Sequence, residues 1–164
     1  MRSCRIAICG LLMMWAATAV AAPSFKLLES GSFAGLVAAR GNQPFLLVLW
    51  SVTCAPCRDE FSLLRTMQAE HPGLPLVLVS TDDISDESVA GKALADFGMT
   101  GEESWIFAED SQKLRYEIDP DWYGELPRAY FYDKNHRREG VSGRLSRKRI
   151  EAWLAETAGD PAGS

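Results

Sequence analysis

Residues 45–60 read FLLVLWSVTCAPCRDE and join two different patterns. The first six residues are apolar without interruption, which is typical of a strand that is covered on both faces. From Pro56 onward the apolar residues recur at helical spacing, which predicts a helix. Cys54 and Cys57 stand at the junction. A CxxC pair between a strand and a helix indicates a redox centre rather than a coincidence of spacing.

The first residues of the chain have the pattern of a secretory signal peptide. Arg2 and Arg5 precede an uncharged apolar run that ends in small residues, so we expect cleavage after Ala21. The run is also close to the minimum length that spans a bilayer, so an uncleaved membrane anchor is the alternative. Both alternatives export the rest of the chain, and we expect it in the periplasm. We therefore predict a signal segment over 1–21, one domain over 22–158 and a disordered tail over 159–164.

The cysteine count indicates a redox-active pair rather than a fold that is stabilised by several disulfides. The chain has four cysteines, and loss of the signal segment would remove Cys4 and Cys9. Cys54 and Cys57 would then remain in a compartment that permits disulfides. A bridge across two residues closes a very short loop and restrains the unfolded chain little. We expect this disulfide to be the redox group, with no further cofactor and no metal.

The charge of the chain argues against nucleic acid as a partner. The full chain has a net charge of −5, which would become −7 once Arg2 and Arg5 are removed with the signal. An acidic domain is a poor ligand for nucleic acid. The charge is also uneven, because residues 82–125 hold 13 acids against three bases and residues 134–149 hold seven bases against Glu139. We interpret these stretches as solvated faces of opposite sign, with a dedicated docking patch as the alternative.

The remaining pattern predicts a single α/β domain. Ser30 and Ser32 are candidate caps for the first helix, and Val89, Leu94 and Phe97 predict the buried face of the third. The strand-helix-strand order around the CxxC predicts a parallel crossover, and the last two strands predict an antiparallel hairpin. We thus expect a central mixed sheet with helices on both faces and a C-terminal hairpin plus helix. Strands are expected over 25–28, 45–50, 74–80, 105–108, 127–132 and 138–142, and helices over 33–40, 56–70, 85–97, 110–118 and 146–156.

Three pieces of sequence carry a resemblance to a known family. They are the pattern WxxxCxPC at residues 50–57, Glu60 three residues later, and GELPRA at residues 124–129 leading into a strand. With these pieces the chain resembles the thioredoxin superfamily, and within it the exported thiol-disulfide oxidoreductases of the TlpA/ResA type. The resemblance covers roughly residues 25–156 and implies a thioredoxin-like fold.

The resemblance also implies an activity and its partners. Such proteins exchange disulfides with partner proteins that carry cysteines or disulfides. The family type favours a reductase, of the kind that serves cytochrome c or copper-site assembly, supplied with electrons by a membrane donor. Oxidases that make disulfides share this fold, so the direction of electron flow stays open. Thr53, Ser62 and Arg128 depart from the residues common in the family, which affects partner specificity and redox poise more than the type of reaction.

The two cysteines are expected to have different roles. Cys54 stands at the start of a helix, where free backbone N–H groups and the helix dipole favour negative charge, so it should ionise easily and act as the nucleophile. Cys57 lies one turn further into the helix and should be more buried. It is expected to attack the mixed disulfide on Cys54 and release the partner.

Glu60 is the candidate proton carrier. It falls on the helix stripe formed with Cys57, Leu64 and Met67, which should face the sheet. An acid on an apolar stripe is costly unless it is used or paired. At three residues from Cys57, Glu60 could take and return the proton of that thiol, and burial would raise its pKa toward the working range. The alternative is that Glu60 points to solvent near the helix N-terminus.

The resemblance implies a substrate-binding region beside the cysteines. Pro127 would be the cis-proline that faces them, and the backbone of Leu126 would pair with an extended segment of the partner. Trp50 would pack beneath the site or contact the partner. Trp122 and Tyr123, in the loop before Pro127, could form an apolar docking rim.

Two other functions are compatible with part of the sequence. A CxxC pair can also bind copper or zinc, but we expect the two histidines, His71 and His136, to be separate loop residues rather than further ligands. A peroxiredoxin would match Ser51, three residues before Cys54, but would need a proline where Leu47 stands. We regard copper binding as the main alternative to redox exchange.

Overall fold

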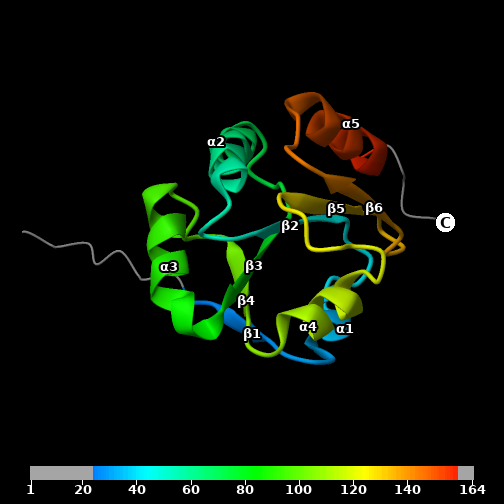
Figure 1. The fold of residues 1–164 in the computed structure, drawn as a ribbon. Coiled ribbons are helices and arrows are strands. Elements are labelled where there is room, and N and C mark those ends of the chain that lie inside the picture. The colour runs from blue at the N-terminus through cyan, green and yellow to red at the C-terminus, as the bar shows by residue number, and fades with distance from the viewer. Residues whose placement is uncertain (1–23, 159–164) are drawn as a thin grey trace, which may run out of the picture.

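A six-stranded mixed sheet forms the centre of residues 24–158, the part of the chain that the computed structural model describes (Figure 1). The predicted signal segment and C-terminal tail lie outside this range. The strands are β1 (Lys26–Leu28), β2 (Phe45–Trp50), β3 (Leu76–Asp83), β4 (Glu103–Phe107), β5 (Arg128–Tyr132) and β6 (Arg138–Ser142). The helices are α1 (Ser32–Ala38), α2 (Ala55–Glu70), α3 (Glu87–Asp96), α4 (Ser111–Ile118) and α5 (Arg147–Ala158), with a 3-10 turn at Ile84–Asp86 before α3.

The sheet has the mixed topology that the sequence predicts. Its strand order is β1-β4-β3-β2-β5-β6. The first four strands in this order are parallel, whereas β5 is antiparallel to β2 and forms a hairpin with β6. Leu49 pairs with Arg128, so the start of β5 lies beside the end of β2. The carboxyl end of β2 therefore meets the loop that leads into β5.

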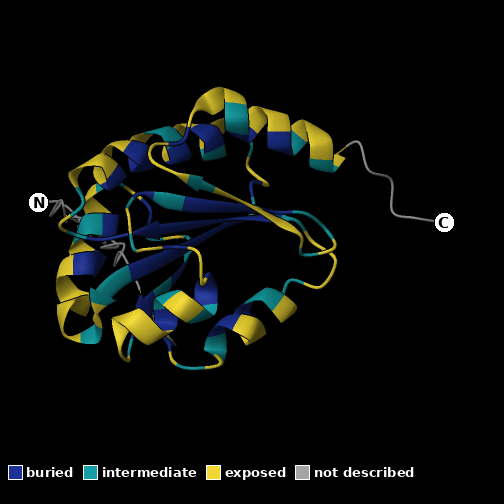
Figure 2. Cartoon of the chain, turned by 45° about the vertical axis from the view of Figure 1, so that its right-hand side comes forward, coloured by how far each residue is buried: buried dark blue, intermediate teal, exposed yellow. Residues whose placement is uncertain are grey.

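Strand β2 lies between two apolar cores, which explains its uninterrupted run of apolar residues. Leu46, Val48 and Trp50 contribute to the core under α2, α3 and α5, while Leu47 and Leu49 contribute to the core over α1 and α4. The strands of the sheet centre are buried and the outer faces of the helices are exposed (Figure 2). A strand with solvent on one face would show alternation, which β2 lacks.

Two local predictions are wrong. Val89 is 53% exposed, because α3 instead turns the side that carries Ala90, Gly91 and Leu94 toward the core. No serine caps α1: Gly31, with φ +81°, occupies the N-cap position, and its N–H donates to Glu117. A left-handed conformation favours glycine, so the backbone geometry determines where this helix begins.

Among residues 24–158, no helix combines the length and the apolar character needed to cross a membrane.

Candidate active site

The cysteine pair lies where β2 gives way to α2. Cys54 is the N-cap residue of α2, with extended backbone, and Pro56 stands in the first helical turn. The sulfur of Cys54 is bonded to the sulfur of Cys57, with an S–S distance of 2.03 Å. Cys54 is partly exposed, whereas Cys57 is buried in the core beneath α2. The disulfide thus has one sulfur near solvent and one within the protein.

The N-cap position gives the sulfur of Cys54 a hydrogen-bond donor. The backbone N–H of Cys57 donates to the Sγ of Cys54, with an N···S distance of 3.2 Å. N–H groups of the first helical turn have no partner within the helix, and they stabilise anions placed at its start. This geometry favours a thiolate on Cys54 in the reduced protein.

Glu60 lies inside the protein on the same face of α2 as Cys57. Only 3% of the residue is exposed, and its Oε1 accepts a hydrogen bond of 2.7 Å from the backbone N–H of Leu145. The Oε2 atom is buried and has no hydrogen-bond partner within residues 24–158. Burial raises the pKa of the Glu60 carboxyl to about 7, against the opposing effects of the Leu145 N–H and the Arg144 charge. The carboxyl can therefore hold or release a proton near neutral pH.

The peptide bond between Leu126 and Pro127 is cis. Pro127 is buried, and its carbonyl oxygen accepts a hydrogen bond of 2.8 Å from the N–H of Gly143. Leu126 is partly buried and contacts the cores on both faces of the sheet. Both residues precede β5 at the edge of the sheet where β2 ends, which is the edge that carries the cysteines.

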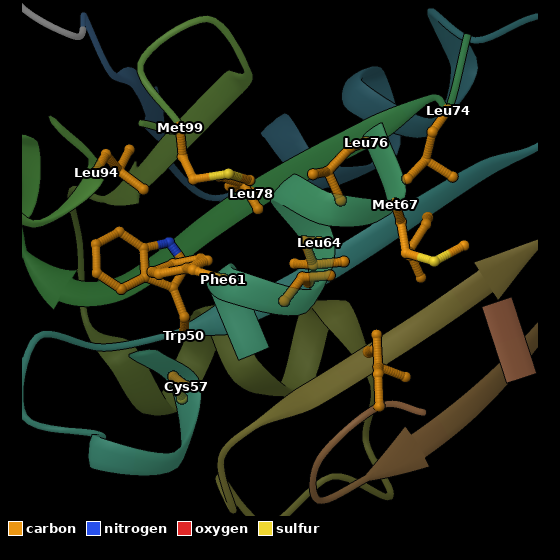
Figure 3. Close-up of a cluster of buried hydrophobic side chains, with 14 of the residues drawn as sticks. Trp50, Cys57, Phe61, Leu64, Met67, Leu74, Leu76, Leu78, Leu94 and Met99 are labelled. Carbon is orange, nitrogen blue, oxygen red and sulfur yellow. The ribbon is translucent and has the colours of Figure 1, made fainter. Parts of the chain in front are cut away.

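Trp50 belongs to the core rather than to a binding surface. It is 0% exposed, and its ring meets that of Phe61 edge-on with 5.0 Å between the ring centres. Figure 3 shows the two rings next to each other beneath α2, with Cys57 nearby. The expectation that Trp50 contacts a partner is therefore wrong for this state, because no part of its side chain reaches the surface. Its role as packing beneath the site agrees with its position.

The loop before Pro127 exposes one of its two aromatic residues. Trp122 is buried, and its indole N–H donates to the carbonyl oxygen of Glu125 at 2.9 Å. Tyr123 is 91% exposed. The prediction that both side chains form an apolar rim is therefore wrong for Trp122, which is buried. Tyr123 is exposed and remains available to a partner.

A polar network beside Cys54 was not predicted. The carboxylate of Asp82, near the end of β3, accepts hydrogen bonds from the Ser51 hydroxyl and from the backbone N–H of Val52. A sequence offers only a weak signal for such a network, namely polar residues directly after each of two apolar runs. The contacts themselves depend on the pairing of β2 with β3 across some 30 residues.

The histidines take the loop positions that the sequence indicates. His71 is the C-cap residue of α2, and His136 lies in the turn between β5 and β6 with φ +59°. Within residues 24–158, no three or more histidine, cysteine, aspartate or glutamate side chains form a group that could hold a metal ion.

Comparison with known proteins identifies the fold. No protein-family model and no curated protein sequence matches the chain, but solved structures do. The chain is similar to a secreted Mycobacterium tuberculosis disulfide oxidoreductase homologous to E. coli DsbE, with a TM-score of 0.58 and 16% identity over 73% of this chain and 85% of that chain.

Two further solved structures show the same likeness. A DsbF homologue from Corynebacterium diphtheriae has a TM-score of 0.60 and 21% identity, over 73% of this chain and 75% of that chain. A thio-disulfide isomerase from Thermus thermophilus has a TM-score of 0.57 and 17% identity, over 72% of this chain and 81% of that chain. The protein therefore has a thioredoxin-like fold, as the sequence resemblance implies.

Proposed function

We propose that this protein is a thiol-disulfide oxidoreductase that uses Cys54 and Cys57 to exchange disulfides with partner proteins. The observation that carries this proposal is the asymmetric disulfide, with Cys54 accessible at a helix N-cap and Cys57 buried one turn later. A nucleophilic thiol needs access and a stabilised thiolate, whereas a resolving thiol needs only to reach the first sulfur. The thioredoxin-like fold supports the same function.

The proposed reaction proceeds in two exchange steps. In the reduced protein the Cys54 thiolate attacks one sulfur of a partner disulfide, forms a mixed disulfide and releases the other partner sulfur, which takes up a proton. Cys57 then loses its proton and attacks the sulfur of Cys54, which restores the Cys54–Cys57 bond and releases the second partner thiol. The partner gains two electrons and two protons, and a dithiol donor reduces the protein again by the reverse steps.

We assign the proton transfer of the second step to Glu60. Cys57 is buried, so its proton needs an acceptor inside the protein. Glu60 lies three residues along the same helix, and burial raises the pKa of its carboxyl to about 7. Its Oε2, which lacks a protein hydrogen-bond partner within residues 24–158, would take the proton and later return it.

We further propose that the protein acts as a reductase outside the cytoplasm, of the type that serves cytochrome c or copper-site assembly. The signal-like sequence over 1–21 and the secreted Mycobacterium tuberculosis neighbour support export. The resemblance to TlpA/ResA-type proteins supports the direction of electron flow and a membrane protein as the dithiol donor. Pro127 and Leu126 would hold an extended segment of the partner beside Cys54.

Trapping of mixed disulfides tests this function. The Cys57→Ala variant should stall on Cys54 and accumulate adducts in the periplasmic fraction that are released by dithiothreitol. The matched control is Cys54→Ala, which leaves only the buried thiol and should capture far fewer partners. Equal capture by the two variants would refute the assigned roles. Adducts with cytochrome or oxidase-assembly proteins would support a reductase, whereas adducts mainly with newly secreted disulfide proteins would contradict that direction.

A further inference from the structure

Asp82 connects β3 to the segment directly before the nucleophilic cysteine. Its carboxylate accepts three hydrogen bonds, from the Ser51 hydroxyl at 2.7 Å, the Val52 N–H at 2.9 Å and the Ser80 hydroxyl at 2.6 Å. Two of the three donors belong to the loop between β2 and α2. A carboxylate that accepts bonds from two successive residues restrains the backbone of that loop.

The network continues from Asp82 to Cys54. The Ser51 hydroxyl oxygen accepts a hydrogen bond of 3.2 Å from the N–H of Thr53, and the Ser51 carbonyl oxygen accepts one of 3.1 Å from the N–H of Cys54. Every residue from 51 to 54 is thus bound to Asp82 or to Ser51. These hydrogen bonds run along the loop that leads directly into Cys54, the N-cap residue of α2.

Asp82 also brings a negative charge that forms no ion pair within residues 24–158. Its three donors are neutral, and the ion pairs formed among residues 24–158 do not include it. Val52, whose N–H contacts the carboxylate, is two residues from Cys54, so their Cα atoms are at most about 7 Å apart. A like charge at short range disfavours ionisation of a thiol.

The charged residues in the first turns of α2 also lie close to Cys54 along the chain. Arg58 is exposed on α2, and Asp59 forms an ion pair of 3.4 Å with Arg144. Glu60 is buried and bound to the N–H of Leu145. None of these groups contacts the loop of residues 51–53 through a hydrogen bond among the described residues, whereas Asp82 does so twice.

We propose that Asp82 is a positioning residue of the active site that fixes the loop before Cys54 and makes the Cys54–Cys57 disulfide harder to reduce. The inference rests on the proposed thiol-disulfide exchange and gives that reaction a direction. Reduction of the disulfide by a dithiol donor adds two electrons and one proton and yields a Cys54 thiolate and a Cys57 thiol. A carboxylate that destabilises this thiolate raises the free energy of the reduced protein, which makes it a stronger electron donor.

The Asp82→Asn variant tests the charge, with Asp83→Asn as its matched control. Asp83 is the next residue on the same strand, carries the same charge, is exposed, and contacts the N–H of Ser85 instead of the loop. The acidity of Cys54 is measured from the ultraviolet absorbance of the thiolate against pH, and the redox equilibrium is measured against glutathione. Asp82→Asn should make Cys54 more acidic and shift the equilibrium about tenfold toward the reduced protein, which corresponds to about 30 mV. Asp83→Asn should change both values far less, because an exposed charge is screened.

Two outcomes would overturn the proposal. One is a Cys54 that becomes less acidic in Asp82→Asn, and the other is an effect equal to that of Asp83→Asn. If Asp82→Asn does not fold, Asp82→Ser replaces it. That variant also removes the charge and keeps a small polar side chain, so it should shift the equilibrium toward the reduced protein, and a shift toward the disulfide would contradict the proposal. A wild-type protein that does not exchange with glutathione would instead refute the proposed function itself.

Discussion

The protonation of Glu60 is coupled to the stability of the fold. Burial raises its pKa from 4.5 to about 7, so between these values the folded protein binds more protons than the unfolded chain. The contribution of Glu60 to the unfolding free energy is therefore fully present below pH 4.5, and it is lost as the pH rises through 7. The difference between the two pKa values corresponds to about 3 kcal/mol. An ionisable residue thus stands where a neutral one would make the fold more stable at alkaline pH, which fits a role in proton transfer.

The Glu60→Gln variant isolates the contribution of Glu60 to the pH dependence of stability. Between pH 5 and pH 8 the oxidised wild type should lose about 2 kcal/mol more unfolding free energy than the variant does. Urea unfolding at both pH values measures the difference. Asp59→Asn, which removes the neighbouring exposed carboxylate paired with Arg144, should retain the wild-type dependence. Parallel pH dependences for wild type and Glu60→Gln would contradict a pKa near 7.

The same pair of variants tests the proton transfer itself. A mixed disulfide between Cys54 and glutathione is formed, and release of glutathione by Cys57 is followed against pH. Glu60→Gln should slow this release on the order of 10²-fold at neutral pH and remove the inflection near pH 7, while Asp59→Asn should leave both unchanged. Retention of the inflection in Glu60→Gln would show that another group carries the proton.

At the scale of the elements, the sequence was most informative where a pattern is local. The apolar run of β2 and the stripe of α2 are fully described by the nearest neighbours along the chain, and both agree with the structure. The partner of Glu60 could not be predicted, because the N–H of Leu145 lies 85 residues away. Asp82 was missed for the same reason, because its hydrogen bonds join the end of β3 to the loop after β2, some 30 residues earlier in the chain. The packing of Trp50 beneath the site was predicted, but its complete burial depends on what α2 places over it. Contacts across elements are the part that local patterns do not encode.

The loop before β5 is an element whose shape is held from both ends. Asp119 accepts a hydrogen bond of 2.7 Å from the Tyr130 hydroxyl and forms an ion pair of 3.0 Å with Arg128, both on β5. The buried Trp122 bonds to Glu125 at the other side of Tyr123. Tyr123 is therefore presented to solvent by an ordered loop, beside the residues proposed to bind the partner. An exposed tyrosine on an ordered loop is a common anchor in protein recognition.

The Tyr123→Ala variant tests whether this loop contacts the partner. With an oxidised CxxC peptide as substrate, the rate should fall about fivefold, the equivalent of about 1 kcal/mol of aromatic contact. With hydroxyethyl disulfide, which is too small to reach the loop, the rate should not change. Tyr116→Ala on α4, also a strongly exposed tyrosine at 69%, is the control and should behave as wild type with both substrates. A loss that is equal for the two disulfides would indicate a disturbed active site instead of a docking contact.

At the scale of the whole molecule, the topology places several residues of the acidic stretch at the edge of the sheet that carries the cysteines. Strands β2, β3 and β4 are parallel, so the residues that follow them meet at one edge of the sheet, which is the edge that carries Cys54. The acids at this edge include Asp82 and Asp83, which are the last two residues of β3, and Glu109 and Asp110, which follow β4. The turn of the basic stretch between β5 and β6 lies at the opposite edge, because β5 runs antiparallel to β2. Charges gathered at one edge produce a field that extends beyond single contacts.

This field should select small disulfides by charge. After division by the rate of a free reference thiol, the reduced protein should react faster with cystamine, which carries two amines, than with oxidised glutathione, which is anionic at neutral pH. The Debye length falls from about 30 Å at 0.01 M salt to about 3 Å at 1 M, so the advantage of cystamine should shrink with salt while the rate with neutral hydroxyethyl disulfide stays constant. Stopped-flow measurements of the rates with the three disulfides over this salt range test the prediction. A ratio that does not change with salt would contradict a long-range effect of these acids on the encounters of Cys54.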